Sequence, residues 1–133
     1  MLSPKNMGRN TITVMGLMFS CLLFGNAKVY VQIHNRGQQD MSEHCWSRDD
    51  DMGVHLLEPG QYHEFSFRPN IWGSTKFVCA VSFGGDEVEK RIMAYQYTRD
   101  SYTCVDLCKW YLSETIACHE NPLSKAEDCS DFW

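Results

Sequence analysis

Five histidines are the side chains of this 133-residue chain best suited to proton transfer, namely His34, His44, His55, His63 and His119. Two histidines that face one substrate can act as general acid and general base, as a secreted ribonuclease or another hydrolase would require. None of the five belongs to a recognised catalytic spacing, and the chain has no Gly-x-Ser-x-Gly nucleophile elbow. We therefore predict surface or packed histidines, no catalytic residue and no enzyme. A secreted hydrolase that uses His44, His55 or His63 is the alternative.

Seven cysteines are the other reactive side chains. One of them, Cys21, lies within residues 1–27, which are interpreted below as a signal peptide that is removed on secretion. The remaining six are Cys45, Cys79, Cys104, Cys108, Cys118 and Cys129. The spacing Cys104-x-x-x-Cys108, with Cys118-His119 downstream, has a faint likeness to zinc-ligand spacing. An even number of cysteines in a short secreted chain instead indicates a disulfide framework, because an oxidising compartment pairs thiols. We therefore predict three disulfides, no metal site and no cofactor.

The acidic run Asp49-Asp50-Asp51, followed by Gly53, invites comparison with a calcium-binding loop. When Gly53 is placed at position six of an EF-hand loop, Arg48, Met52 and Pro59 fall at positions that need oxygen ligands. Those three side chains cannot supply the oxygens. The run is therefore interpreted as a solvated turn.

Residues 1–27 are predicted to be a secretory signal peptide. Lys5 and Arg9 form a basic start, residues 14–25 are an apolar run, and Gly25 and Ala27 are the small residues of a cleavage site. The apolar run is too short for a membrane anchor, since a spanning helix needs roughly 20 apolar residues. We expect the secreted, extracellular form to begin at or near Lys28. Residues 28–133 then form a single domain that contains six cysteines.

Net charge narrows the classes of partner. The whole chain has 12 basic and 17 acidic residues, and removal of residues 1–27 takes away only the two basic ones, Lys5 and Arg9. A nucleic-acid-binding surface or a surface for anionic membranes needs a basic patch, which this composition does not supply. We therefore expect no nucleic-acid partner and no membrane insertion of the mature chain, which we expect to be a monomer. The same charge counts against a defence protein that attacks membranes.

The elements that must position these groups are short strands. Runs with period-two alternation cover residues 28–35, 41–47, 54–57, 61–68, 75–83, 91–97, 107–113 and 116–118, and turn residues such as Pro59-Gly60 and Gly84-Gly85 separate them. The alternation predicts an all-β, disulfide-stabilised β-sandwich of about seven or eight antiparallel strands. No segment shows a helical stripe, although Leu123–Cys129 could form one helical turn.

An ordered series of short motifs links this chain to a known family. His44-Cys45-Trp-Ser47 precedes Asp49-Asp-Asp-Met-Gly53-Val-His55; Pro59-Gly60, Phe65-Ser-Phe67-Arg68-Pro69-Asn70, Trp72-Gly73-Ser-Thr75, Phe77-Val-Cys79 and Cys108-Lys-Trp110 follow. The series, which extends from about Val29 to Cys118, resembles the plant self-incompatibility proteins, the S-protein homologues. Residues 119–133, with Cys129, form an additional tail. Gly73 is expected to adopt a backbone conformation barred to other residues.

The resemblance implies a small secreted β-sandwich with two disulfides among Cys45, Cys79, Cys108 and Cys118. From it we predict the pairs Cys45–Cys118 and Cys79–Cys108, which leaves Cys104–Cys129 to tether the tail. It also implies a non-enzymatic extracellular ligand that a cell-surface receptor recognises, in the rejection of self pollen or in another cell-to-cell signal. Partner choice normally resides in exposed loops. The partner-binding residues are therefore predicted in two loops, as Arg48, Asp49, Asp50, Asp51, Asn70 and Trp72.

Overall fold

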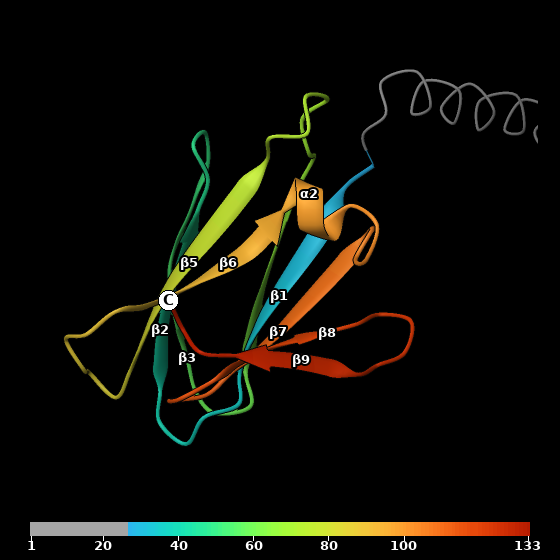
Figure 1. Ribbon diagram of the computed structural model, residues 1–133. Coiled ribbons are helices and arrows are strands. Elements are labelled where there is room, and N and C mark those ends of the chain that lie inside the picture. Colours follow the sequence, from blue (N-terminus) through green and yellow to red (C-terminus); the bar gives the residue numbers. More distant parts are fainter. Residues whose placement is uncertain (1–26) are drawn as a thin grey trace, which may run out of the picture.

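The structure is a computed structural model that describes residues 27–133 (Figure 1). The predicted signal peptide, except for Ala27, lies outside the described residues, as does Cys21. The described elements are β1 (Val29–Asn35), β2 (Met41–Trp46), β3 (Asp51–Leu57), β4 (Tyr62–Phe67), β5 (Lys76–Phe83), β6 (Lys90–Gln96), the short helix α2 (Tyr97–Asp100), β7 (Leu107–Leu112), β8 (Ala117–Glu120) and β9 (Glu127–Ser130). No helix in this range is long and apolar enough to cross a bilayer.

The strands form two sheets that pack into a sandwich, as the alternation predicted. One sheet has the order β4-β1-β7-β8-β9 and the other has the order β3-β2-β5-β6. Within residues 27–133 there are nine strands, and every ladder is antiparallel except the parallel pair β1–β7. The prediction of a helical turn within Leu123–Cys129 is wrong. Glu127–Ser130 instead forms β9, because its backbone completes the ladder with β8.

The core lies between the sheets and follows from the period of two. In β1, Val31 and Ile33 are fully buried while Tyr30 on the opposite face is exposed. Phe77 of β5 meets Phe67 of β4 with ring centroids 4.5 Å apart, so the two sheets interlock through aromatic side chains. Burial of each such ring contributes on the order of 1.5–3 kcal/mol. This rigid interior fixes the positions of the loops at both ends.

The disulfides pair cysteines that are close in the structure, and the predicted connectivity is wrong. All six cysteines are paired, as Cys45–Cys79, Cys104–Cys108 and Cys118–Cys129. Cys45 stands opposite Cys79 in the β2–β5 ladder, and Cys118 stands opposite Cys129 in the β8–β9 ladder. None of the three predicted pairs is present, and Cys108 bonds instead to Cys104, four residues before it in the chain. Strand register decides the pairing instead, because directly opposed residues of adjacent strands bring their Cβ atoms within about 4.5–5.5 Å.

Candidate functional site

One end of the sandwich gathers the segments that the sequence predicts as contact loops. The turn 47–50 joins β2 to β3, and the loop 68–75 joins β4 to β5; both lie toward the top of Figure 1. They meet because Trp46, at the end of β2, pairs with Val78, near the start of β5. A cleft of about 470 Å³ lies between the two segments. We call these two segments, residues 47–50 and 68–75, the loop end.

Four of the six predicted partner-binding residues line this one cleft. They are Arg48, Asp49 and Asp50 from the turn and Asn70 from the loop. The buried rings of Phe67 and Phe77 are also among the residues that line the cleft. The cleft therefore combines polar side chains from two loops with a floor that belongs to the hydrophobic core.

Hydrogen bonds within each loop hold its shape. In the turn, the Ser47 hydroxyl accepts hydrogen bonds from the backbone N–H groups of Asp49 and Asp50, at 3.3 and 3.1 Å. In the loop, the Asn70 side-chain oxygen accepts from the N–H groups of Trp72 and Ser74, both at 3.1 Å. Short polar side chains that bond nearby backbone groups in this way are typical of ordered turns. The two loops thus present a defined surface.

Gly73 and Asp51 have structural roles at this end of the sandwich. Gly73 has φ +72°, in the left-handed region, as the sequence predicted. Asp51 does not line the cleft, because it begins β3 and accepts hydrogen bonds at 2.8 Å from both His44 Nε2 and the backbone N–H of Gly53. Both bonds lower the pKa of Asp51 below its usual value, and the bond from the Gly53 backbone is the larger cause.

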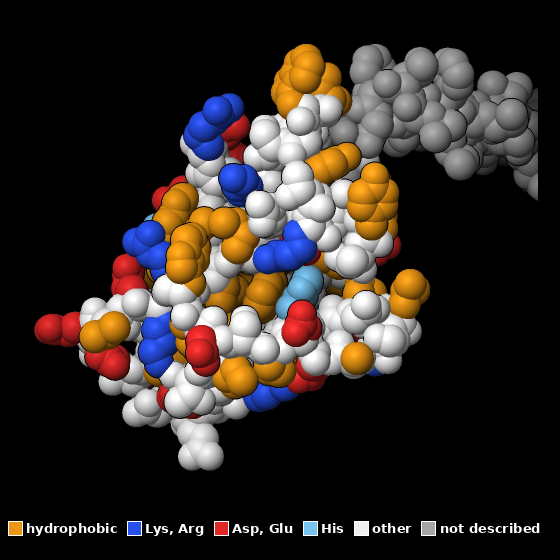
Figure 2. Space-filling view, in the orientation of Figure 1, with side chains coloured by type: hydrophobic (Ala, Val, Ile, Leu, Met, Phe, Trp, Pro, Cys, Tyr) orange, Lys and Arg blue, Asp and Glu red, His pale blue; other side chains and the backbone are white. Residues whose placement is uncertain are grey.

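Large hydrophobic side chains are exposed in the 68–75 loop and in the connection from α2 to β7. Trp72 is 82% exposed and Ile71 next to it is 65% exposed, both in the 68–75 loop. Tyr102 and Val105, in the connection from α2 to β7, are also exposed. Figure 2 shows hydrophobic side chains at this end of the molecule together with Lys and Arg side chains. Trp72, the sixth predicted residue, therefore stands outside the cleft as an exposed aromatic group.

The histidines occupy separate places, and two of the three proposed catalytic candidates come together. His34 stacks against Tyr62 on the outer face of the five-stranded sheet, with centroids 4.6 Å apart, and His119 stacks on Trp110. Burial lowers the pKa of His34 and of His119. His44 pairs with Asp51, whereas His55 of β3 and His63 of β4 stack on each other with centroids 3.6 Å apart.

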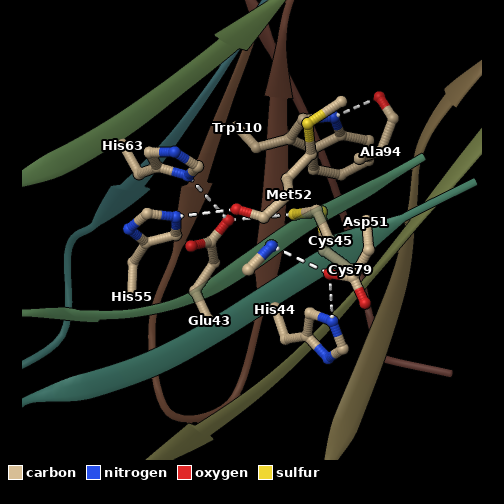
Figure 3. Close-up of a disulfide and its surroundings, with 11 residues drawn as sticks. Glu43, His44, Cys45, Asp51, Met52, His55, His63, Cys79, Ala94 and Trp110 are labelled. Atoms are coloured by element: carbon tan, nitrogen blue, oxygen red, sulfur yellow. Dashed lines mark hydrogen bonds and ion pairs between the residues drawn. A yellow bond between two sulfur atoms is a disulfide. The ribbon is translucent and has the colours of Figure 1, made fainter.

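A buried carboxylate, Glu43, lies beside His55 and His63, and it is not among the residues predicted from the sequence. His63 Nδ1 lies 3.1 Å from Glu43 Oε1, and His55 Nε2 donates to the Met52 carbonyl at 2.9 Å (Figure 3). Glu43 is 0% exposed, and burial raises the pKa of its carboxyl group above the usual value. The sequence does contain a signal for this residue, because Glu43 is an acidic residue on the same face of β2 as the buried Met41 and Cys45. We call Glu43, His55 and His63 the edge cluster.

Comparisons with known proteins identify the family. A sequence profile described as plant self-incompatibility protein S1 matches residues 30–133. The chain belongs to this family. The match extends through the C-terminal segment 119–133, beyond the resemblance that ended at Cys118. Family membership places the protein among the small, secreted, disulfide-bonded proteins of plants.

Individual relatives agree with this assignment. The chain is 34% identical to S-protein homolog 5 of Arabidopsis thaliana over 106 residues, which cover 80% of this chain and 78% of that protein. It is 35% identical to S-protein homolog 6 of the same plant over 85 residues, which cover 63% of this chain and 60% of that protein. A solved structure of self-incompatibility protein homologues, described as small, highly stable, secreted plant proteins, matches with a TM-score of 0.62. At 14% identity, over 81% of this chain and 96% of that one, this match shows the shared fold.

Proposed function

We propose that this protein is a secreted, non-enzymatic signalling ligand that a cell-surface receptor recognises through the loop end. The observation that carries the proposal is the cleft between residues 47–50 and 68–75, which unites two loops that lie apart in the sequence. Membership of the self-incompatibility family supports a role in the rejection of self pollen or in another cell-to-cell signal. A rigid sandwich that displays ordered loops suits recognition, because loops can vary while the scaffold stays fixed.

The chemistry of the loop end suits a protein partner. The Arg48 side chain is 91% exposed, and its Nε atom lies 3.7 Å from Asp49 Oδ1. Asp50 and Lys76 also line the cleft, so charges of both signs are displayed within a small area. Mixed charges discriminate between partners, because a wrong partner brings like charges together. Trp72 adds an exposed aromatic side chain of the kind that dominates the binding energy of many interfaces.

We propose that the mature chain acts as a monomer, without nucleic acid and without insertion into a membrane. Its acidic composition supports this, since 17 acidic residues outnumber 12 basic ones even before any leader is removed. The receptor is a protein surface that complements both the charges of the cleft and the exposed Trp72.

A binding assay with a matched control tests the loop end. The oxidised chain from residue 28 is titrated onto responsive plant cells, and its pollen-tube arrest or its saturable surface binding is measured. Trp72→Ala and Arg48→Ala should each weaken the response at least about tenfold, as loss of a binding hot spot does. Leu123→Ala is the control, because Leu123 is 93% exposed but lies in the connection between β8 and β9. An equal loss in all three variants would contradict recognition through the loop end.

The same assay separates the ligand from the alternative enzyme. Replacement of His44, His55 or His63 singly by Ala should leave the response within several-fold of the wild type in variants that circular dichroism shows to be folded. Loss of a general acid or base typically lowers a rate by about 10²–10⁴-fold. A folded histidine variant that loses a hydrolytic activity by that factor would overturn the proposal in favour of a secreted hydrolase.

A further inference from the structure

The edge cluster stands at the open edge where the two sheets meet. β3 is an edge strand of the four-stranded sheet and β4 is an edge strand of the five-stranded sheet. Glu43 stands directly opposite His55 in the β2–β3 ladder, so their side chains point to the same face of that sheet. His63 comes from the other sheet and points the same way as the buried Phe65 and Phe67 of β4. Three strands from both sheets therefore direct one polar side chain each to one place (Figure 3).

Glu43 is short of hydrogen-bond partners at this place. Its Oε2 atom is buried and has no hydrogen-bond partner among the described residues. Cys45 Sγ approaches Oε1 to 2.9 Å, but this sulfur belongs to the disulfide with Cys79 and has no hydrogen to donate. Within the described part of the chain, His63 Nδ1 is therefore the one hydrogen-bond donor in contact with a carboxylate that can accept several hydrogen bonds. A buried carboxylate oxygen without a partner is costly, and such a group calls for an explanation.

The donors are spaced as metal ligands. One ligand atom from each of Glu43, His55 and His63 lies within 4.8 Å of the other two. A tetrahedral zinc ion with bonds of about 2.0–2.1 Å separates its ligand atoms by about 3.4 Å, close to the 3.1 Å between His63 Nδ1 and Glu43 Oε1. His55 and His63 are half-buried, so their rings can adjust while Glu43 remains fixed. Two histidines and one glutamate are a known zinc-ligand set.

Other groups in residues 27–133 have similar spacing but different chemistry. They are Cys104–Cys108–His119, Glu43–Cys45–Cys79 and Cys118–Glu127–Cys129. Each contains two cysteines that are joined in a disulfide, and a disulfide sulfur is no thiolate ligand. The edge cluster differs from these three groups because none of its donor atoms is a disulfide sulfur.

We infer that Glu43, His55 and His63 form a binding site for a divalent transition-metal ion, of which Zn²⁺ is the representative, that joins the two sheets at their open edge. The ion supplies a positively charged partner for the buried carboxylate, and it links β2 and β3 of one sheet to β4 of the other. Three protein ligands leave a fourth position for water. An ion that binds the folded but not the unfolded chain stabilises the fold by mass action. The sequence-based prediction of no metal site rested on the cysteine spacing and the Asp49–Asp51 run, neither of which contains these three residues.

Calorimetric titration with ZnCl₂ tests the site. The oxidised chain from residue 28, prepared without a polyhistidine tag, is titrated near pH 7.4, and thermal unfolding is followed with Zn²⁺ or with EDTA. We expect one saturable site with a dissociation constant in the micromolar range or below, and a higher melting temperature with Zn²⁺ than with EDTA. Absence of saturable binding up to 1 mM Zn²⁺ would overturn the inference.

Variants assign the ligands. His55→Asn, His63→Asn and Glu43→Gln should each weaken Zn²⁺ binding at least tenfold. His44→Asn is the matched control, since His44 is the neighbour of Glu43 in β2 but pairs with Asp51; it should change the affinity less than twofold. If Glu43→Gln fails to fold, the two half-buried histidines still decide the result. Unchanged binding in the edge-cluster variants, or an equal loss in His44→Asn, would show that the site lies elsewhere.

Discussion

The loop end and the edge cluster are two polar regions on one hydrophobic sandwich, and they differ in how their polar atoms are satisfied. At the loop end, Ser47 and Asn70 bond the backbone of their own loops, and Arg48 projects into solvent. In the edge cluster, Glu43 is fully buried, and one of its oxygens has no hydrogen-bond partner within residues 27–133. Exposed polar groups cost little, so only their convergence on one cleft points to a function. A buried unpaired oxygen is costly, so it calls for an explanation even without neighbouring polar groups.

The largest expected effect compares a buried residue that lines the cleft, Phe77, with an exposed residue at its rim, Arg48. Phe77→Ala should lower the free energy of unfolding by about 3–5 kcal/mol, because the ring is 1% exposed and packs on Phe65 and Phe67. Arg48→Ala at the rim should change it by less than about 0.5 kcal/mol. Urea unfolding of the oxidised proteins measures both values. A loss above about 1 kcal/mol for Arg48→Ala would show that the rim also holds the fold.

The next effect tests the stability cost of the edge cluster. Glu43→Leu should raise the free energy of unfolding by about 1–2 kcal/mol in EDTA, because an apolar side chain removes a buried carboxyl group with an unpaired oxygen. Glu43→Gln, which keeps the shape and a polar end, should gain less. Urea unfolding near neutral pH compares the three proteins. A Glu43→Leu protein that is less stable than the wild type would mean that the carboxylate makes a net favourable interaction without metal.

The smallest expected effect concerns how stability changes with pH, which should have opposite signs for the carboxyl groups of Glu43 and Asp51. Burial raises the pKa of Glu43, so the stability from its protonation is fully present below pH 4.5 and is lost as the pH rises through its raised pKa. Bonds to Gly53 and His44 lower the pKa of Asp51, so its contribution is present above pH 3.8 and is lost as the pH falls through its lowered pKa.

Urea unfolding between pH 3 and 7, in EDTA, compares the wild type with Glu43→Gln and Asp51→Asn. Relative to Glu43→Gln, the wild type should become less stable as the pH rises above 4.5. Relative to Asp51→Asn, it should become less stable as the pH falls below 3.8. The same direction of change for both pairs would contradict the difference between the regions.

The strands themselves were largely predictable. Alternation located seven of the nine strands to within one or two residues, because the side-chain period of two depends only on which face is buried. The exceptions are β3, which begins at Asp51 where a turn was expected, and β9, in which all four residues are exposed. An exposed strand has no buried face and leaves no apolar pattern. Its position is fixed by pairing with β8, which the local sequence does not encode.

The sequence by itself determined the family, the all-β class, the pairing of all six cysteines in disulfides, and the two loops of the candidate contact surface, since each depends on residue type, period or turn chemistry. Only the tertiary structure decided which cysteines pair, because strand register sets Cys45 opposite Cys79 and Cys118 opposite Cys129. Only the tertiary structure joined Arg48 and Asn70 in one cleft and brought Glu43, His55 and His63 together from two sheets. Contacts between strands distant in sequence depend on how the sheets stack, and that stacking is a property of the whole core.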